Sequence, residues 1–530
     1  MKTLYLNGTI ITMEEGTAQA VLEEDGIITA VGEEEAMKAM AKGARVVDLD
    51  GKTMLPAFID AHSHFSAYAN SMLQIPLEEV VTFGELKEKI REYIEKNNIP
   101  EGKWVIAKGF DPGNMEEQTY PTRQVLDEAA PHHPVLVQHK SGHMGVMNTL
   151  GLDVCGITRN TKSPEGGRIG MEHGELTGYL EENALIQYLD VVGMPTKEEL
   201  QEVFLKAQKS YASYGITTIQ EGMTMDSMVP LYQMLESQHM LYLDLVAYAD
   251  MANSRELLTT FSDRIGRYRN HIKIGGYKIF LDGSPQGRTA WMRTPYKGGG
   301  DYKGYPTMTD EAVYTAIRTA AKERRQILAH CNGDAASDQY IRMCRRVEEE
   351  GYPLKSIRPV LIHGQLLGLD QLEAVKEIPL LPSFFVAHVY HWGDTHIRNF
   401  GKERADFISP AGSAGRKGIR YTFHQDSPVI EPDMLETVWC AISRKTKKGV
   451  TLGEMEKISV LDALKAVTIH AAYQYFEEGE KGSIKPGKHA DFVLLDKNPL
   501  EVSADEIRQI RVLETIKDGK IIYRREEMEQ

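Results

Sequence analysis

The sequence predicts an α/β protein: a (β/α)8 TIM barrel with a small β-sandwich domain built from both termini and an inserted lobe after strand one. Three observations predict it. Eight apolar runs of strand type are mostly separated by helix-like stretches, short strand-like runs occur at both ends, and a long interval follows the first barrel strand. At 530 residues the chain exceeds one average domain, and a barrel with insertions accounts for much of that length.

The two ends of the chain alternate short strand-like runs with Gly and Asp/Glu turns. The first end contains TLYLNGTIITM, GIITAVG and ARVVDLDG, and the other end contains KHADFVLLD and VLETIKDGKIIYR. Such runs are typical of a small antiparallel sheet. We therefore assign residues 1–53 and 475–530 to the two parts of one β-sandwich, and residues 54–474 to the barrel.

The barrel begins with LPAFIDAHSHF, residues 55–65, and an inserted lobe of about residues 66–213 follows. The lobe has strands of its own, KWVIAKGF and HPVLVQH, and an amphipathic helix, TFGELKEKIREYIEK. Seven further runs come after Gly215: GITTIQEG, LYLDLVAYAD, IKIGGYKIFLDG, RQILAHCNG, RPVLIHGQ, IPLLPSFF and IRYTFHQDSPV. Eight strands alternating with helices indicate a barrel whose active site gathers at the carboxyl ends of the strands.

Candidate metal ligands stand at those carboxyl ends. In an extended strand His62 and His64 project to the same side, and two convergent imidazoles suit a divalent metal. The other candidates end strands four, five, six and eight: Lys278, His330, His363 and Asp426. Each has an ordinary alternative, namely a surface or core histidine, an ion-paired lysine, or an aspartate in a turn before Ser427-Pro428. Their joint distribution predicts a metal site.

Charge and composition favour a small-molecule partner. The chain has 61 Lys+Arg against 76 Asp+Glu, and a net charge of −15 opposes binding to nucleic acid or to an anionic membrane. The N-terminal run lacks the pattern of a signal peptide, and no apolar stretch is long enough for a bilayer. The 4 cysteines are scattered and form no C-x-x-C pair, so a cytoplasmic location is expected.

At these residues the sequence resembles the amidohydrolase superfamily and, within it, the branch of YtcJ-like and N-substituted-formamide-deformylase-like hydrolases (amidohydrolase family 3). The resemblance covers nearly the whole chain and shows in LPAFIDAHSHF, TYPTRQVLDEAAPHHPV, SGHMGVMNT, GITTIQEG, YKIFLDGSPQGRTAW, ILAHCNGDAA, HQDSPV and GSIKPGKHADFVLLD. Two places depart from the branch: Cys331-Asn332 stands where Ala-Ile is frequent, and His424-Gln425 where Gly-Ser is common.

The resemblance implies one or two divalent ions per chain, with Zn²⁺ as the expected metal. His62 and His64 would hold one ion with Asp426, and His330 and His363 would hold a second. A carboxylated Lys278 would bridge them. A shared hydroxide would be the nucleophile, and Asp426 would pass its proton to the leaving amine.

Three further residues are expected to contribute to the site without binding the metal. His143, in the pair Gly142-His143, matches a branch motif and would hydrogen-bond the substrate carbonyl, while a loop-capping histidine is the alternative. Asp60 and Asp282 are expected to orient ligands or loops. A homodimer is expected, because such β-domains often contribute dimer contacts in the superfamily.

The predicted activity is hydrolysis of an amide-type C–N bond, other than a peptide bond, in a small molecule. One alternative is a mononuclear deaminase, whose sites carry a Glu near the strand-five or strand-six histidine, and HCNGD and HGQLL offer none. Another is an inactive scaffold of this fold, which would have lost ligands. A metal content of about two, one or no ions per chain separates the three.

Overall fold

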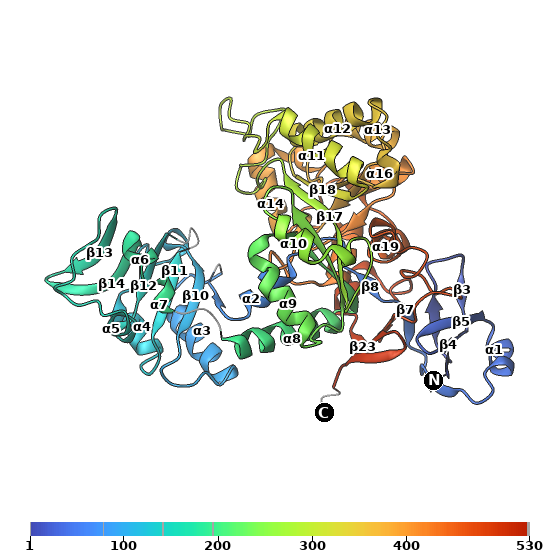
Figure 1. Ribbon diagram of the computed structural model, residues 1–530, viewed down its shortest axis with the longest axis horizontal. Coiled ribbons are helices and arrows are strands. Elements are labelled where there is room, and N and C mark those ends of the chain that lie inside the picture. The colour runs from blue at the N-terminus through green and yellow to red at the C-terminus, as the bar shows by residue number, and fades with distance from the viewer. Residues whose placement is uncertain (1, 78, 140–142, 193–195, 527–530) are drawn as a thin grey trace. The chain divides into compact units, whose positions relative to one another are not determined.

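The computed structural model describes residues 2–77, 79–139, 143–192 and 196–526. The chain divides into two compact units, Met1–Ser66 with Leu205–Gln530, and Ala67–Phe204. Figure 1 shows both as ribbons coloured along the chain.

Eight parallel strands form the central sheet of the first unit, in the order β21-β20-β19-β18-β17-β16-β15-β8. Their bounds are β8 Phe58–Ile59, β15 Ile216–Thr224, β16 Asp244–Asp250, β17 Ile272–Phe280, β18 Gln326–Cys331, β19 Val360–His363, β20 Leu381–Phe384 and β21 Thr422–Phe423. Because parallel strands covered on both faces bury nearly every side chain, they read in the sequence as continuous apolar runs. The eight strands lie in the eight predicted runs.

The two edge strands of this sheet, β8 and β21, meet just beyond their carboxyl ends. The backbone N–H of Asp426 donates to the carbonyl of His62 at 3.2 Å, and that of His64 donates to Ser427 at 2.8 Å. The sheet therefore curls until its first and last strands are joined, as in a TIM barrel.

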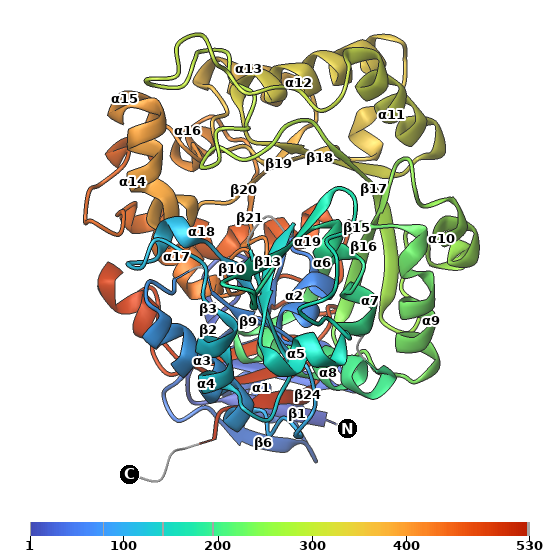
Figure 2. The same cartoon turned by 90° about the vertical axis from the view of Figure 1, so that its left-hand side faces the viewer.

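Helices lie outside the strands of the barrel. Figure 2 shows them as an arc, with α9 and α10 on one side, α11 to α13 over the top and α14 on the other side. The bounds are α9 Val229–Ser237, α10 Arg255–Thr260, α11 Asp310–Glu323, α12 Asp334–Glu349, α13 Leu369–Glu377 and α14 His388–Phe400. Thr309 caps α11 by accepting from the Ala312 N–H at 3.3 Å.

The first unit has two smaller sheets, one built only from N-terminal strands and one built from strands of both termini. One has the order β5-β4-β1-β6, and the other has the order β24-β23-β22-β7-β2-β3. The bounds are β1 Lys2–Leu6, β2 Thr9–Ile11, β3 Thr17–Ala18, β4 Ala20–Glu24, β5 Ile27–Gly32, β6 Arg45–Asp48, β7 Thr53–Pro56, β22 Phe492–Leu495, β23 Val512–Lys517 and β24 Lys520–Arg524. Figure 2 shows β1, β6 and β24 together.

One hydrophobic core joins these two sheets. It includes Tyr5 and Val21 from the first sheet and Met54, Phe492 and Ile516 from the second. The predicted fold class is thus confirmed, with a TIM-barrel-like sheet and additional sheets. The domain boundaries 1–53, 54–474 and 475–530 stay a proposal.

The second unit has its own mixed sheet, in the order β13-β14-β12-β11-β10-β9. The bounds are β9 Ile75–Pro76, β10 Val105–Phe110, β11 Val135–His139, β12 Met144–Met147, β13 Gly167–Glu172 and β14 Glu175–Glu182. The predicted amphipathic helix is confirmed as α3, Phe83–Lys96, which buries Leu86 and Ile90. Val105 and Val135 lie in the same core, so the lobe has a hydrophobic core of its own.

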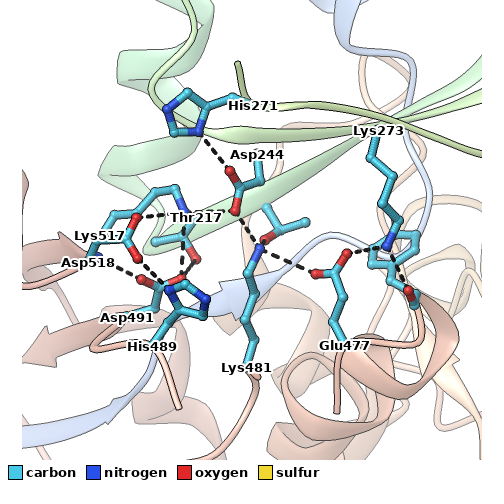
Figure 3. Close-up of polar contacts among 12 residues, drawn as sticks. Thr217, Asp244, His271, Lys273, Glu477, Lys481, His489, Asp491, Lys517 and Asp518 are labelled. Atoms are coloured by element: carbon cyan, nitrogen blue, oxygen red, sulfur yellow. Dashed lines mark hydrogen bonds and ion pairs between the residues drawn. The ribbon is translucent and has the colours of Figure 1, made fainter. Parts of the chain in front are cut away.

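A buried charged cluster lies at the amino ends of the barrel strands (Figure 3). We call it the amino-end cluster, and its buried members are Asp244, Lys273, Glu477, Lys481, Asp491 and Lys517. Lys517 Nζ lies 2.7 Å from Asp244 Oδ2, and Lys481 Nζ also contacts that carboxylate. Lys273 pairs with Glu477 in the same way. Through these ion pairs the cluster connects the C-terminal segment to the amino ends of β16 and β17.

Within the described ranges, no helix is both long and apolar enough to cross a membrane.

Candidate metal centre

The structure brings the six predicted ligands together at the carboxyl ends of the barrel strands. The Nε2 atoms of His62 and His64 each lie 3.5 Å from Asp426 Oδ1, and His363 Nε2 lies 3.9 Å from Asp426 Oδ2. One ligand atom each from His62, His64 and Asp426 fall within 4.8 Å of one another. This set is compact enough to surround a single ion.

The remaining two candidates border the same group. His330 Nδ1 lies 3.0 Å from His363 Nε2, and Lys278 Nζ lies 3.2 Å from His62 Nε2. Lys278 is fully buried on β17, while His330 lies on β18. The pair His330 and His363 therefore lies directly beside the group formed by His62, His64 and Asp426.

The backbone turns sharply at two of these residues. His363 has a φ of 74° and Asp426 a φ of 56°, in the left-handed region that non-glycine residues seldom adopt. Each costs on the order of 1 kcal/mol and persists only where its surroundings hold it. Such strain is common where a side chain has to be aimed at a functional site.

Burial keeps the site histidines neutral. It lowers the pKa of His64 to about 4 and that of His330 to about 3, and the nearby Lys278 charge adds to both shifts. The pKa values of His62 and His363 lie well below the usual histidine range, again chiefly because of burial. A neutral imidazole keeps a lone pair on one nitrogen, which is the form that binds a metal.

Gln220 fixes the orientation and tautomer of His62. Its side-chain nitrogen donates to the carbonyl of Ala61 at 2.7 Å and to the hydroxyl of Tyr475 at 2.8 Å. Its Oε1 consequently faces His62 Nδ1 at 2.6 Å and has to accept a proton from it. His62 therefore presents the lone pair of Nε2 toward Asp426.

Buried carboxylates surround the ligands. Burial raises the pKa of Asp60 to about 6 and the pKa values of Glu221 and Asp282 to about 7. Glu221 accepts from the Ser66 N–H at 2.7 Å and lies 3.8 Å from His64 Nδ1. Asp282 accepts from three backbone N–H groups, those of Trp291, Asn332 and Gly333, at 3.0, 2.9 and 2.7 Å. Both carboxylates hold loops and imidazoles in place.

These residues fit a divalent ion. Asp426 Oδ1 is buried and has no hydrogen-bond partner, although two imidazole nitrogens lie near it. A buried carboxylate oxygen without a partner is costly, and an ion between it and the imidazoles would satisfy all three groups. Burial also lowers the pKa of Lys278, although the Asp426 charge opposes that shift. Imidazole nitrogen and carboxylate oxygen are ordinary ligands of Zn²⁺.

His143 lies in the second unit, on the segment before β12. Its Nδ1 is 2.9 Å from Glu182 Oε2, and its ring is largely exposed. Gly142, the other member of the predicted pair, lies outside the described residues. A catalytic role of His143 stays a prediction.

Four residues beside the candidate ligands were not assigned from the sequence. Gln220, Glu221 and His424 contact His62, His64 and His363 respectively, and Ser383 contacts His424. A signal was available for three of them. Gln220 and Glu221 end the strand GITTIQEG, and His424 stands two positions before Asp426, on the same side of an extended chain. Ser383 has no such signal, because serines are ordinary in buried strands.

Comparisons with known proteins identify the family of this chain. The family described as "Amidohydrolase family" matches residues 45–523. The "Putative amidohydrolase YtcJ" of Bacillus subtilis (strain 168) is 28% identical, over 99% of this chain and 99% of that protein. The "N-substituted formamide deformylase" of Arthrobacter pascens is 27% identical, over 98% of each. An uncharacterized metal-dependent hydrolase from Pyrococcus horikoshii OT3 has a TM-score of 0.75 and 25% identity, covering 95% of this chain and 99% of that chain.

Proposed function

The chain belongs to the amidohydrolase family, and on that premise we propose that it is a metal-dependent hydrolase that cleaves an amide-type C–N bond, other than a peptide bond, in a small molecule. The observation that carries the proposal is the buried, unpartnered oxygen of Asp426 beside two neutral histidines. The formamide deformylase that matches along almost the whole chain adds support, since its name describes such a bond.

His62, His64 and Asp426 would hold one ion, and His330 with His363 would hold a second. Zn²⁺ is the metal we expect. When bound, such ions act as Lewis acids and lower the pKa of water toward neutrality. Lys278 would join the two positions as a carbamate, because its burial favours the neutral amine that reacts with CO2.

Asp426 is the residue we assign to proton transfer. Burial raises its pKa, which makes its carboxylate a better base than an exposed one, while Lys278 opposes the shift. In hydrolysis it would accept the proton of the attacking water and return it to the nitrogen of the leaving amine. His143 is assigned to the substrate carbonyl, which it would hydrogen-bond.

A mononuclear deaminase is the second candidate. Of the histidine, cysteine and acidic side chains in the described part of the chain, His62, His64 and Asp426 form the one group of three with the spacing of a metal site. A single ion held there, with Lys278 unmodified, would suit a deaminase.

Metal content and activity of the purified chain test the proposal. We expect about two ions per chain after loading with Zn²⁺, and turnover of an N-formyl, N-acyl-amino-acid or cyclic amide compound. His62→Ala should lose at least one ion and most of the activity, because the remaining ligands cannot close the site. His173→Ala, which changes a histidine that is 93% exposed, is the control. Full metal content and turnover in His62→Ala would place the site elsewhere.

A further inference from the structure

Buried hydrogen bonds continue outward from His363 to two residues with no assigned role. His363 Nδ1 lies 3.0 Å from His424 Nε2, and His424 Nδ1 lies 2.8 Å from Ser383 Oγ. The three residues are 3%, 0% and 0% exposed. They come from β19, from the residue after β21, and from β20, so the chain of contacts links three neighbouring strands.

The direction of these hydrogen bonds decides what His363 can bind. A neutral imidazole has one N–H and one lone pair. If His363 Nε2 keeps the lone pair that faces His330 and Asp426, the proton is on Nδ1 and is donated to His424 Nε2. His424 then carries its own proton on Nδ1 and donates it to Ser383 Oγ. In the opposite direction Ser383 donates, and His363 Nε2 carries a proton that blocks a metal.

We infer that His424 and Ser383 are positioning residues that hold His363 as the Nδ1–H tautomer, with the Nε2 lone pair presented to the second metal position. The inference rests on the proposed function. It corresponds to the role of Gln220 toward His62, where an amide oxygen accepts from Nδ1 at 2.6 Å. The amide can only accept there, whereas the Ser383 hydroxyl can accept or donate.

The apolar surroundings of His424 make the Ser383 hydroxyl important as the hydrogen-bond acceptor of its Nδ1–H. The ring of Phe385 lies 5.4 Å from that of His424 and 6.3 Å from that of His363, so aromatic carbon covers this side of the chain of contacts. A buried N–H without an acceptor is costly. Without the Ser383 oxygen, the Nδ1–H form of His424 would lose its acceptor, and the reverse tautomer of both rings would become more favourable. Position 424 is also one of the places where this chain departs from the branch pattern, so the family resemblance does not supply this contact.

The test uses the full-length chain, loaded with Zn²⁺ and labelled with ¹⁵N at histidine. NMR separates protonated from unprotonated ring nitrogens, and His424→Gln identifies the signals of that ring. We expect protons on Nδ1 of both His363 and His424 in the loaded protein. Ser383→Ala should weaken binding of the second ion about 10–100-fold, measured by competition with a chelator. Ser383→Thr keeps a hydroxyl and should restore most of the affinity.

Ser337→Ala is the matched control. Ser337 is also 0% exposed, and its hydroxyl donates to the Gly333 carbonyl at 3.0 Å in its own helix, so this variant measures the cost of losing a buried hydroxyl alone. A proton on His424 Nε2 in the loaded wild type would overturn the inference. Wild-type affinity and unchanged tautomers in Ser383→Ala would do the same and would leave the proposed function standing. A wild-type chain that binds no metal would overturn both.

Discussion

At the amino ends of the barrel strands, three buried lysines face three buried carboxylates, whereas at the carboxyl ends Lys278 has no described carboxylate within the 4.0 Å of an ion pair. Lys273 and Lys278 show the contrast on one strand, β17. Lys273 contacts Glu477 and the Tyr475 carbonyl, while Lys278 contacts an imidazole nitrogen. In the first cluster every buried charge has an opposite charge within 4.0 Å, whereas in the second the acceptor atoms of Asp426 and the histidines face one another.

This contrast separates stability from function. Burying a charge is tolerated when an opposite charge is held close to it, as in the amino-end cluster. An incomplete set of buried donors and acceptors costs stability, and it persists where a ligand completes it. We therefore expect substitutions at the amino ends to lower the free energy of unfolding. Substitutions at the carboxyl ends should instead weaken metal binding.

The largest effect is expected when the same substitution is made in each cluster. Asp244→Asn leaves Lys481 and Lys517 without their main partner and should lower the free energy of unfolding by about 3–5 kcal/mol. Asp426→Asn removes the charge of a carboxylate whose buried Oδ1 has no hydrogen-bond partner, so the unfolding free energy of the metal-free protein should stay unchanged or rise. Urea denaturation of both variants measures this. Asp505→Asn, in an exposed pair with Lys445, is the control and should have no measurable effect.

The ionisation of Asp244 predicts the direction in which the stability of the protein changes with pH. Burial would raise its pKa, but Lys481 and Lys517 outweigh burial and hold the pKa well below the usual aspartate value of 3.8. Its contribution to stability is therefore present above about pH 4 and is lost as the pH falls through the folded-state pKa. Asp244→Asn should lose less stability on acidification than the wild type. An equal loss in both proteins would contradict the assignment.

An intermediate effect is expected at Lys278 and should appear in metal content rather than in folding. Lys278→Ala should lose the second ion, because two divalent ions about 3.5–4 Å apart repel each other without a bridging anion. Acetate should restore part of the metal content by occupying the vacated volume as a bridge. Elemental analysis with and without acetate measures this. A variant that keeps both ions without acetate would show that Lys278 is not a bridge.

The smallest effect is expected at His489, at the edge of the amino-end cluster. Its Nδ1 lies 2.6 Å from Asp518 Oδ1, and this hydrogen bond raises the pKa of His489 above 6.5. The stabilisation is thus fully present below about pH 6.5 and is lost as the pH rises through the folded-state value. His489→Gln should remove a small decline in melting temperature between about pH 6 and 8. An identical decline in the variant would assign it to another group.

The sequence predicted the barrel well because its strands are buried on both faces. Runs such as RPVLIHGQ and IPLLPSFF cannot alternate polar and apolar residues in a covered parallel sheet, so β19 and β20 were visible as continuous apolar segments. The candidate ligands could be named for a related reason, because functional side chains of a barrel gather at the carboxyl ends of its strands. Their role as ligands stays a prediction.

The sequence could not predict contacts that depend on distant partners. Lys273, Lys481 and Lys517 look like ordinary surface lysines until the fold places Asp244 and Glu477 beside them. The same holds for Ser383 and His424, which are 41 positions apart and meet only because β20 and β21 are neighbours. The local sequence pattern indicates burial and secondary structure, whereas contacts between distant residues are known only once the fold is known.

The hydrogen bonds that join the first and last barrel strands have a consequence for how the protein is made. They join the backbone of His62 to that of Asp426, which lies 364 positions later in the chain (426 minus 62), and the backbone of His64 to that of Ser427. Closing so long a segment carries an entropic cost that later contacts have to repay. During synthesis His62 and His64 leave the ribosome early, and Asp426 follows only after most of the chain has been made. A nascent chain therefore lacks a complete candidate metal centre until Asp426 has been synthesised and the barrel has closed.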